Sequence, residues 1–190
     1  MRILGVDPGL TRCGLGVIDT GAGRSLALVE VSVAGAPATL PGPERLGRIY
    51  DAVDAVFDAL RPDVVAIEAV FAQHNVRTVM GVAQISGVIM VQARSRNLDV
   101  VTYTPSQVKA ALTGNGRAAK GQVAFMVATS LGLDGPPSPA DAADALAIAI
   151  THARTATSAS GIAASGLPGR AGTSAQQRWA EAEKQARKRS

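Results

Sequence analysis

Four acidic side chains stand where a fold could gather them into one site. Asp7 closes an apolar segment at the start of the chain, and Glu68 closes a second apolar segment. Asp141 and Asp144 lie three residues apart in an Ala-, Leu- and Ile-rich stretch, so they share a face if that stretch is a helix. A carboxylate on such an apolar helix is costly to bury unless it is paired or bound to a metal.

Such a set of acids is suited to a divalent metal site. Oxygen ligands without a cluster of His or Cys beside them favour Mg²⁺ or Mn²⁺ over zinc. Two such ions side by side activate water and stabilise the leaving oxygen in phosphodiester hydrolysis. Each acid alone also has an ordinary explanation: a turn for Asp7, a solvated strand end for Glu68, and a complement to a helix dipole for Asp141. Only the set as a whole points to metal-dependent hydrolysis.

The elements that would position these acids follow from the hydrophobic periodicity. Alternation and β-branched content predict strands, and three- and four-residue spacing of apolar residues predicts helices. The predicted strands cover 2–7, 12–19, 25–34, 64–67 and 100–103, and the predicted helices cover 44–60, 75–96, 105–112, 120–131 and 139–153. This order predicts an α/β sandwich, in which a mixed five-stranded sheet combines a three-stranded antiparallel meander and two parallel strands, with helices on both faces.

The charge divides the chain of 190 residues into two parts. Through residue 154 there are 13 basic and 13 acidic residues, so the net charge of +4 comes from the remainder. We therefore predict one globular domain over 1–154 and a basic, low-complexity, disordered tail over 155–190, with a helix at most over Gln176–Arg189. Within the domain, residues 73–120 hold six basic residues against Asp99 alone. Either a basic surface for a polyanion or scattered solvated charge would account for that excess.

Composition excludes several classes of protein. The single cysteine, Cys13, rules out a disulfide framework. The longest apolar stretch, Val79–Val91, is interrupted by Gln84 and Ser86 and is too short to cross a bilayer. We expect a cytoplasmic protein with no membrane partner.

Three segments, in order, resemble the signature blocks of the RuvC family. They are Ile3–Gly9 (ILGVDPG), Ala66–Phe71 (AIEAVF) and Asp141–His152 (DAADALAIAITH). The family comprises the bacterial crossover-junction endodeoxyribonucleases that resolve Holliday junctions, and the resemblance covers residues 1 to about 153. It implies a ribonuclease H-like fold, a four-way DNA junction as substrate, and roles in recombination and DNA repair.

The resemblance also implies roles for the acids. Asp7, Glu68, Asp141 and Asp144 match the family's catalytic tetrad, which would hold two Mg²⁺ ions, with Mn²⁺ as a substitute. Water would attack the scissile phosphorus in line and leave a 5′-phosphate and a 3′-hydroxyl. Some relatives carry His in place of the first helix acid, so Asp141 leaves the coordination and the metal preference open.

Further residues match positions that contact DNA in the family. Lys109 and Lys120 are the only lysines before residue 155 and would neutralise phosphate, with Lys120 also stabilising charge in the transition state. Phe71 would stack on a base at the opened crossover. Arg77 is expected to touch DNA because of its place in the segment that follows Phe71, not because of a family match. Exposed lysines without a role and core packing of Phe71 are the alternatives.

The predicted helix 75–96 is apolar over more than one face. The resemblance implies a two-fold homodimer with this helix at the interface, although a helix buried on several sides in the core would have the same apolar pattern. It also implies partnership with the RuvA–RuvB branch-migration complex. Two alternative functions stay open at this point: a non-catalytic junction-binding module, and a related single-domain nuclease that acts on RNA.

Overall fold

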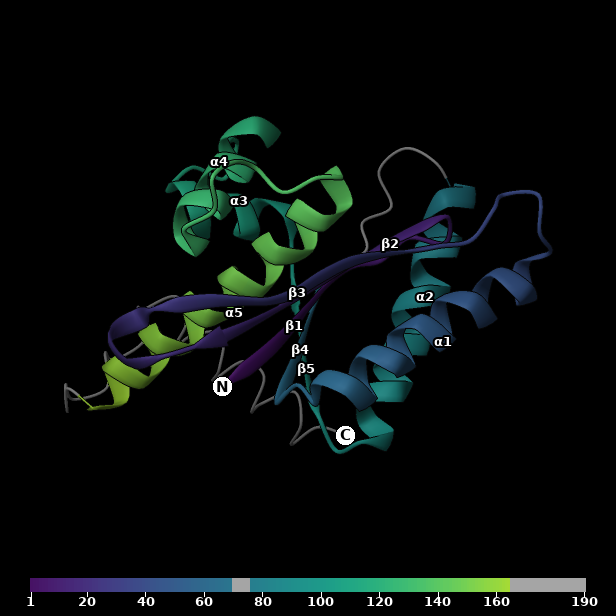
Figure 1. The fold of residues 1–190 in the computed structure, drawn as a ribbon, viewed down its shortest axis with the longest axis horizontal. Coiled ribbons are helices and arrows are strands. Elements are labelled where there is room, and N and C mark those ends of the chain that lie inside the picture. The colour runs from purple at the N-terminus through teal and green to yellow at the C-terminus, as the bar shows by residue number, and fades with distance from the viewer. Residues whose placement is uncertain (70–75, 165–190) are drawn as a thin grey trace, which may run out of the picture. The chain divides into compact units, whose positions relative to one another are not determined.

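A five-stranded mixed sheet forms the centre of the molecule (Figure 1). The computed structural model describes residues 1–69 and 76–164. The strands, in the spatial order β3-β2-β1-β4-β5, are β3 (Leu26–Gly35), β2 (Arg12–Thr20), β1 (Arg2–Asp7), β4 (Val64–Glu68) and β5 (Asp99–Tyr103). The first three pair antiparallel, and β4 and β5 join β1 as parallel strands. The predicted meander with two parallel strands is thus confirmed.

Helices cover both faces of this sheet, as predicted (Figure 1). One face packs against α1 (Gly42–Leu60) and α2 (Val76–Ser95), and the other against α3 (Pro105–Thr113), α4 (Lys120–Leu131) and α5 (Ala140–Ala164). A short 3-10 turn, Ala22–Arg24, joins β2 to β3.

The predicted end of the last helix at residue 153 is wrong, because α5 continues to Ala164. The segment after 153 is rich in alanine, the best helix former, and no proline stops it before Pro168. The prediction of disorder from residue 155 is therefore wrong for 155–164. The first compact unit of the chain is Met1–Thr157. The domain boundary at 154 stays a prediction, and the rest of the predicted tail lies outside the described residues.

Successive residues of β1 enter two separate cores. Leu4 and Val6 pack toward α1 and α2, whereas Ile3 packs toward α3, α4 and α5. Since side chains alternate along a strand, Asp7 faces the same side as Ile3. The strand register therefore directs Asp7 toward α5.

Helix α5 lies unusually close to the sheet because glycines face it. A Cβ on Gly14 of β2 would overlap the backbone carbonyl oxygen of Asp141, and a Cβ on Gly5 of β1 would overlap that of Ala145. Glycine at both positions lets the helix backbone approach the strands directly. This contact brings the start of α5 to the ends of β1 and β2.

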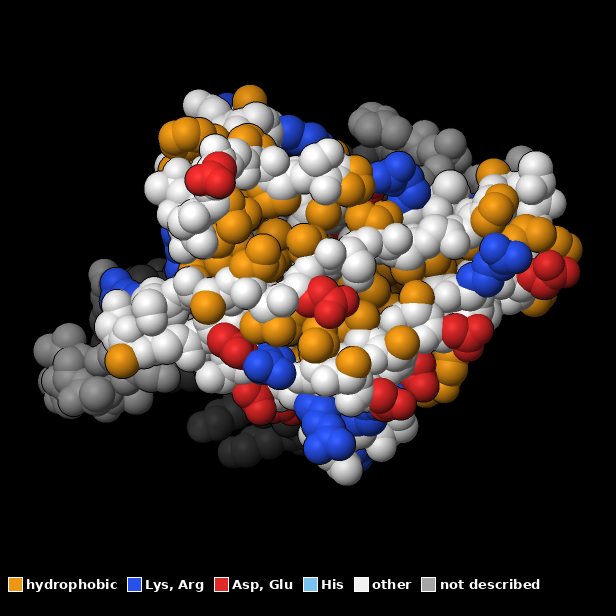
Figure 2. All heavy atoms as spheres, viewed as in Figure 1, with side chains coloured by type: hydrophobic (Ala, Val, Ile, Leu, Met, Phe, Trp, Pro, Cys, Tyr) orange, Lys and Arg blue, Asp and Glu red, His pale blue; other side chains and the backbone are white. Residues whose placement is uncertain are grey.

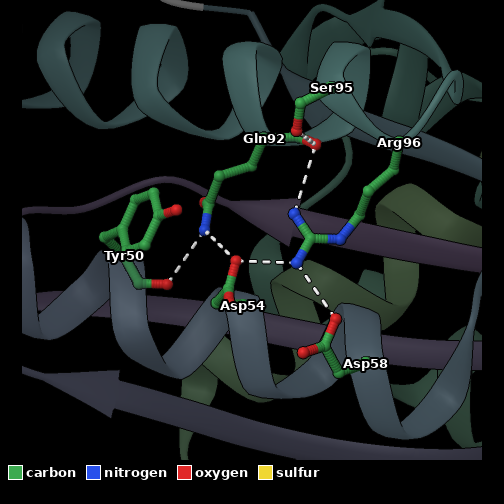
Figure 3. A network of polar contacts seen from close by, with 6 residues as sticks. All are labelled: Tyr50, Asp54, Asp58, Gln92, Ser95 and Arg96. Carbon is green, nitrogen blue, oxygen red and sulfur yellow. Dashed lines mark hydrogen bonds and ion pairs between the residues drawn. The ribbon is translucent and has the colours of Figure 1, made fainter.

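On the opposite face, a polar network joins α1 to the end of α2 (Figure 3). The Nη2 atom of Arg96 lies 2.8 Å from Asp54 Oδ1 and 3.0 Å from Asp58 Oδ1, and the guanidinium stacks 5.0 Å from the ring centre of Phe57. Gln92 donates from Nε2 to Asp54 Oδ1 (3.2 Å) and to the carbonyl oxygen of Tyr50 (3.0 Å). The network holds α1 and α2 together on the face of the sheet opposite to α5.

The surface drawn in Figure 2 shows Lys and Arg side chains scattered among Asp and Glu rather than gathered in one patch. None of the helices in the described part of the chain has the length and apolarity needed to span a bilayer.

Candidate active site

The ends of two parallel strands bring Asp7 and Glu68 together. Val6 of β1 pairs with Ile67 of β4, and the two acids are the next residues on their strands. Glu68 shares a strand face with Val64, which packs in the α5-side core, so both carboxylates lie on the α5 side. The predicted parallel pairing of the two strands required Asp7 and Glu68 to be neighbours in this way.

The first turns of α5 bring Asp141 and Asp144 to the same place. Asp141 stands directly over Gly14, the residue that pairs with Asp7 across β1 and β2. Asp144 is close enough to raise the pKa of both Asp7 and Glu68. All four predicted acids thus meet at one edge of the sheet.

Burial and like charge make this cluster electrostatically costly. Burial, followed by repulsion from Glu68, Asp144 and Asp141, raises the pKa of Asp7 to about 7. Burial and the charge of Asp144 likewise raise the pKa of Glu68. A site that disfavours its own negative charge in this way is suited to a cation.

Two basic side chains reach the helix acids. Lys120, the first residue of α4, places Nζ 3.1 Å from Asp144 Oδ2, and this hydrogen bond is the chief reason that its pKa is raised. Arg12, the first residue of β2, donates from Nε to Asp141 Oδ2 at 2.6 Å. No role for Arg12 was predicted from the sequence. Its position just beyond the turn that follows Asp7 was the available signal, but its partner, Asp141, lies 129 residues away.

The donor set fits a divalent ion, although its side chains do not surround one. In residues 1–69 and 76–164, no three carboxylate, imidazole or thiol groups are placed to hold a metal ion as they stand. Asp141 and Asp144 are instead turned onto Arg12 and Lys120. Four oxygen ligands with a raised pKa at Asp7 nevertheless match what Mg²⁺ and Mn²⁺ bind. The acids would close on an ion once these two pairs open.

The other predicted site residues are placed less completely. Lys109 of α3 is half-buried, and its charge lowers the pKa of Glu68, so it lies beside the cluster. Arg77 lies in the first turn of α2, but its side chain is outside the described part of the structure. Phe71 lies outside the described residues altogether.

Cys13 lies behind the cluster and is fully buried. Burial, reinforced by the nearby charges of Asp7 and Asp141, raises the pKa of its thiol to about 12. The thiol is therefore neither a nucleophile nor a metal ligand at neutral pH.

Comparison with known proteins identifies the family. A model of the family described as "Crossover junction endodeoxyribonuclease RuvC" matches residues 3–152. The chain belongs to the RuvC family. A RuvC from Frankia casuarinae is 59% identical over 152 residues, covering 80% of this chain and 88% of the relative. One from Paenarthrobacter aurescens is 53% identical over 189 residues, covering 100% and 98%.

A solved structure extends the comparison to three dimensions. Thermus thermophilus RuvC in complex with a Holliday junction substrate is 40% identical, with a TM-score of 0.79, covering 84% of this chain and 96% of that one. The ribonuclease H-like fold expected from the resemblance is confirmed. The chain is a RuvC-family crossover junction endodeoxyribonuclease, a metal-dependent hydrolase of recombination and DNA repair, and the two alternative functions are not supported.

Proposed function

We propose that this chain resolves four-way DNA junctions by paired, symmetric nicks, using Asp7, Glu68, Asp141 and Asp144 as its catalytic acids. The observation that carries the proposal is the meeting of these four carboxylates at one sheet edge, with the pKa of Asp7 raised to about 7. Membership of the RuvC family supplies the reaction, and the Thermus thermophilus relative was solved with the same class of substrate.

Two Mg²⁺ ions per site, replaceable by Mn²⁺, are the cofactors we propose. Bound there, they would polarise the scissile phosphate and make a water molecule more acidic. Asp7 lies centrally, under the influence of the other three acids, and would contribute to both ions. Glu68 and the two helix acids would complete the ligand set. Hydrolysis then leaves a 5′-phosphate and a 3′-hydroxyl.

Lys120 and Lys109 would act on the DNA strand that is cut. Lys120 has an ammonium group at the acid cluster and a side chain that is 79% exposed, so it can meet both the acids and a phosphate. A cation so placed stabilises the negative charge that develops during hydrolysis. Lys109 adds phosphate neutralisation beside Glu68. We assign Phe71 to stacking on a base at the crossover, and Arg77 to a DNA contact.

We further propose a homodimer through α2, because a two-fold substrate cut twice calls for two sites related by the same axis. Met80 and Val91 of α2 are 56% and 70% exposed, which leaves apolar surface for a partner. The RuvA–RuvB complex is the partner that family membership suggests. The cytoplasm, where bacterial DNA is found, is the compartment we assign.

Cleavage of a synthetic mobile four-way junction tests the activity. Wild type, Asp7→Asn and Asp144→Asn are incubated with Mg²⁺, and the cuts are mapped on all four strands. We expect symmetric paired nicks by wild type, and loss of at least about a hundredfold in rate by each variant, because each removes a ligand that acts in the transition state. Both variants should still bind the junction.

A linear duplex of the same sequence is the control substrate, and Asp51→Asn, an exposed acid on α1, is the control variant. Cutting of the duplex at the same rate would contradict junction selectivity. Cleavage that persists in Asp7→Asn would remove Asp7 from the catalytic set.

A further inference from the structure

Arg12 connects the acid cluster to a second, basic region. Its Nε donates to Asp141 Oδ2 at 2.6 Å, while its side chain remains 53% exposed. The Nη1 and Nη2 groups make no hydrogen bond with any residue that the structure describes. One edge of the guanidinium therefore holds one of the proposed catalytic acids, and the other edge has no partner among the described residues.

Beside Arg12 the surface is hollowed by a cavity of about 400 Å³. Its lining includes the turn after β1, Arg45 of α1 and Gly81 of α2, and it contains two arginines and no acid. Arg45 donates from Nη2 to Thr11 Oγ1 at 2.6 Å, and its Nη1 makes no hydrogen bond with a residue that the structure describes. Two guanidinium groups with unused N–H donors thus border one hollow, which is the chemistry that recognises a phosphate.

We propose that Arg12 exchanges partners during the reaction: it holds Asp141 when no metal is bound, and binds a backbone phosphate of the junction, together with Arg45, when a metal ion takes Asp141. This inference rests on the proposed function, in which Asp141 is a metal ligand. The hollow bordered by Arg12 and Arg45 is then a phosphate subsite next to the catalytic acids.

Electrostatics gives the exchange its direction. A divalent ion at Asp141 withdraws the carboxylate from Arg12 and repels the guanidinium, since like charges at close range repel. The guanidinium released from Asp141 then forms an ion pair with a phosphate of the DNA strand that enters the site. Arg12 therefore weakens metal binding in the free enzyme and strengthens DNA binding in the metal-loaded enzyme.

Direct metal titration tests the first half. Mn²⁺ binding without DNA is followed by electron paramagnetic resonance for wild type, Arg12→Gln and the control Arg24→Gln, whose side chain lies in the β2–β3 turn. We expect Arg12→Gln to bind Mn²⁺ about two- to fivefold more tightly, the range set by losing one exposed ion pair. Unchanged or weaker binding would overturn the exchange, because Arg12 would then be inert or would orient Asp141 for the metal.

Salt-dependent junction binding tests the second half. Affinity is measured by fluorescence anisotropy in EDTA and in Ca²⁺, with the junction checked on a gel for cutting. Arg12→Gln should lower the salt slope by about one in Ca²⁺ and by much less in EDTA, since each phosphate contact contributes about one to the slope. Arg45→Gln, which has no acid to release it, should lower the slope equally in both. An equal effect of Arg12→Gln in both conditions would refute the exchange.

The two proposals fail in different ways. If Asp7→Asn binds Mn²⁺ as tightly as wild type, the acid cluster is not the metal site and the proposed function fails with it. If Asp7→Asn loses the metal while Arg12→Gln changes neither titration, only the exchange is wrong.

Discussion

At the scale of single residues, the negative charge of the acid cluster is only partly compensated by basic side chains. Four carboxylates meet two cations, and the cations engage only the helix acids, Asp141 and Asp144. Asp7 has no such partner among the described residues, and burial, followed by repulsion from the other three acids, raises its pKa to about 7. The same repulsion that destabilises the metal-free protein gives a metal ion a reason to bind.

This balance predicts how stability depends on pH without metal. The pKa of Asp7 is about 7 in the folded protein and about 3.9 in an unfolded chain, so its contribution to stability is present below pH 4 and lost as the pH rises through 7. Asp7→Asn cannot ionise and should therefore raise the free energy of unfolding by about 2–4 kcal/mol at pH 8 in EDTA. Urea denaturation at several pH values measures this.

The gain should change little above pH 7 and shrink as the pH falls from about 7 toward 4, and Mg²⁺ should stabilise wild type but not Asp7→Asn. Asp51→Asn, at an exposed acid on α1, provides the comparison. A constant difference between Asp7→Asn and wild type across this pH range would show that the effect is not titration of Asp7.

At the scale of elements, the site depends on how closely α5 lies against the sheet. Gly14 and Gly5 remove the side chains that would hold the helix away. The capping box at Thr104, whose Oγ1 accepts from the amide of Gln107, fixes the start of α3. Arg154 of α5 donates to the carbonyl oxygen of Ala111, near the end of α3. These contacts position α5, which carries Asp141 and Asp144, and α3, which carries Lys109.

Gly14→Ala tests the close approach of α5. The added Cβ meets backbone of Asp141, which has no rotamer to escape into, so the start of α5 must move. We expect the free energy of unfolding to fall by about 1–3 kcal/mol, the usual cost of overpacking. The rate of junction cleavage should fall by a larger fraction than the free energy of unfolding does. Chemical denaturation and the junction assay measure the two effects.

Gly47→Ala in α1 is the matched control. Nothing lies within 4 Å of a Cβ built there, so the same change in an exposed helix should raise stability by about 0.5–1 kcal/mol and leave cleavage unchanged. Wild-type cleavage by Gly14→Ala would show that the acids do not depend on this contact.

How much the sequence predicted also differs by element. The strands and the short helices follow from local periodicity, and the meeting of Asp7 with Glu68 follows once β1 and β4 are neighbours. The length of α5 was missed because Ala-, Ser- and Thr-rich sequence reads as a linker, although alanine continues a helix. The pair of Arg12 with Asp141 was missed because it depends on the exact packing of α5 over Gly14, which no local pattern encodes.

At the scale of the whole molecule, α2 serves two surfaces. Ile85, Ile89 and Ala93 are fully buried against the sheet, so the explanation as a core helix holds for that face. A second row at helical spacing is exposed, and comprises Met80, Gln84, Gly87 and Val91. A Cβ on Gly87 would meet nothing within 4 Å, so the middle of this row is open. Met80, Gly87 and Val91 leave this row largely apolar, with Gln84 as its one polar member, which suits packing against a second copy of the same helix.

Val91→Lys tests the proposed dimer without disturbing the fold. The side chain of Val91 is 70% exposed, so lysine there should leave the stability of the protomer within about 0.5 kcal/mol of wild type. In an isologous interface the substitution places two charges in apolar contact, and we expect the dimer dissociation constant to rise at least about tenfold. Sedimentation over a range of concentrations measures it. Phe125→Lys, which replaces an apolar residue 63% exposed on α4, is the control.

The proposed dimer would also link this helix to the chemistry, because each protomer would bring one acid cluster. A supercoiled plasmid with an extruded cruciform distinguishes the outcomes: two coordinated cuts give linear DNA, whereas a single cut gives a nicked circle. Wild type and Phe125→Lys should yield the same ratio of linear to nicked product at first turnover. Val91→Lys should shift the product toward nicked circles at protein concentrations where it is monomeric, and concentrations that restore the dimer should restore the linear product. A linear fraction that does not change as the dimer dissociates would show that the two cuts are coupled by another surface.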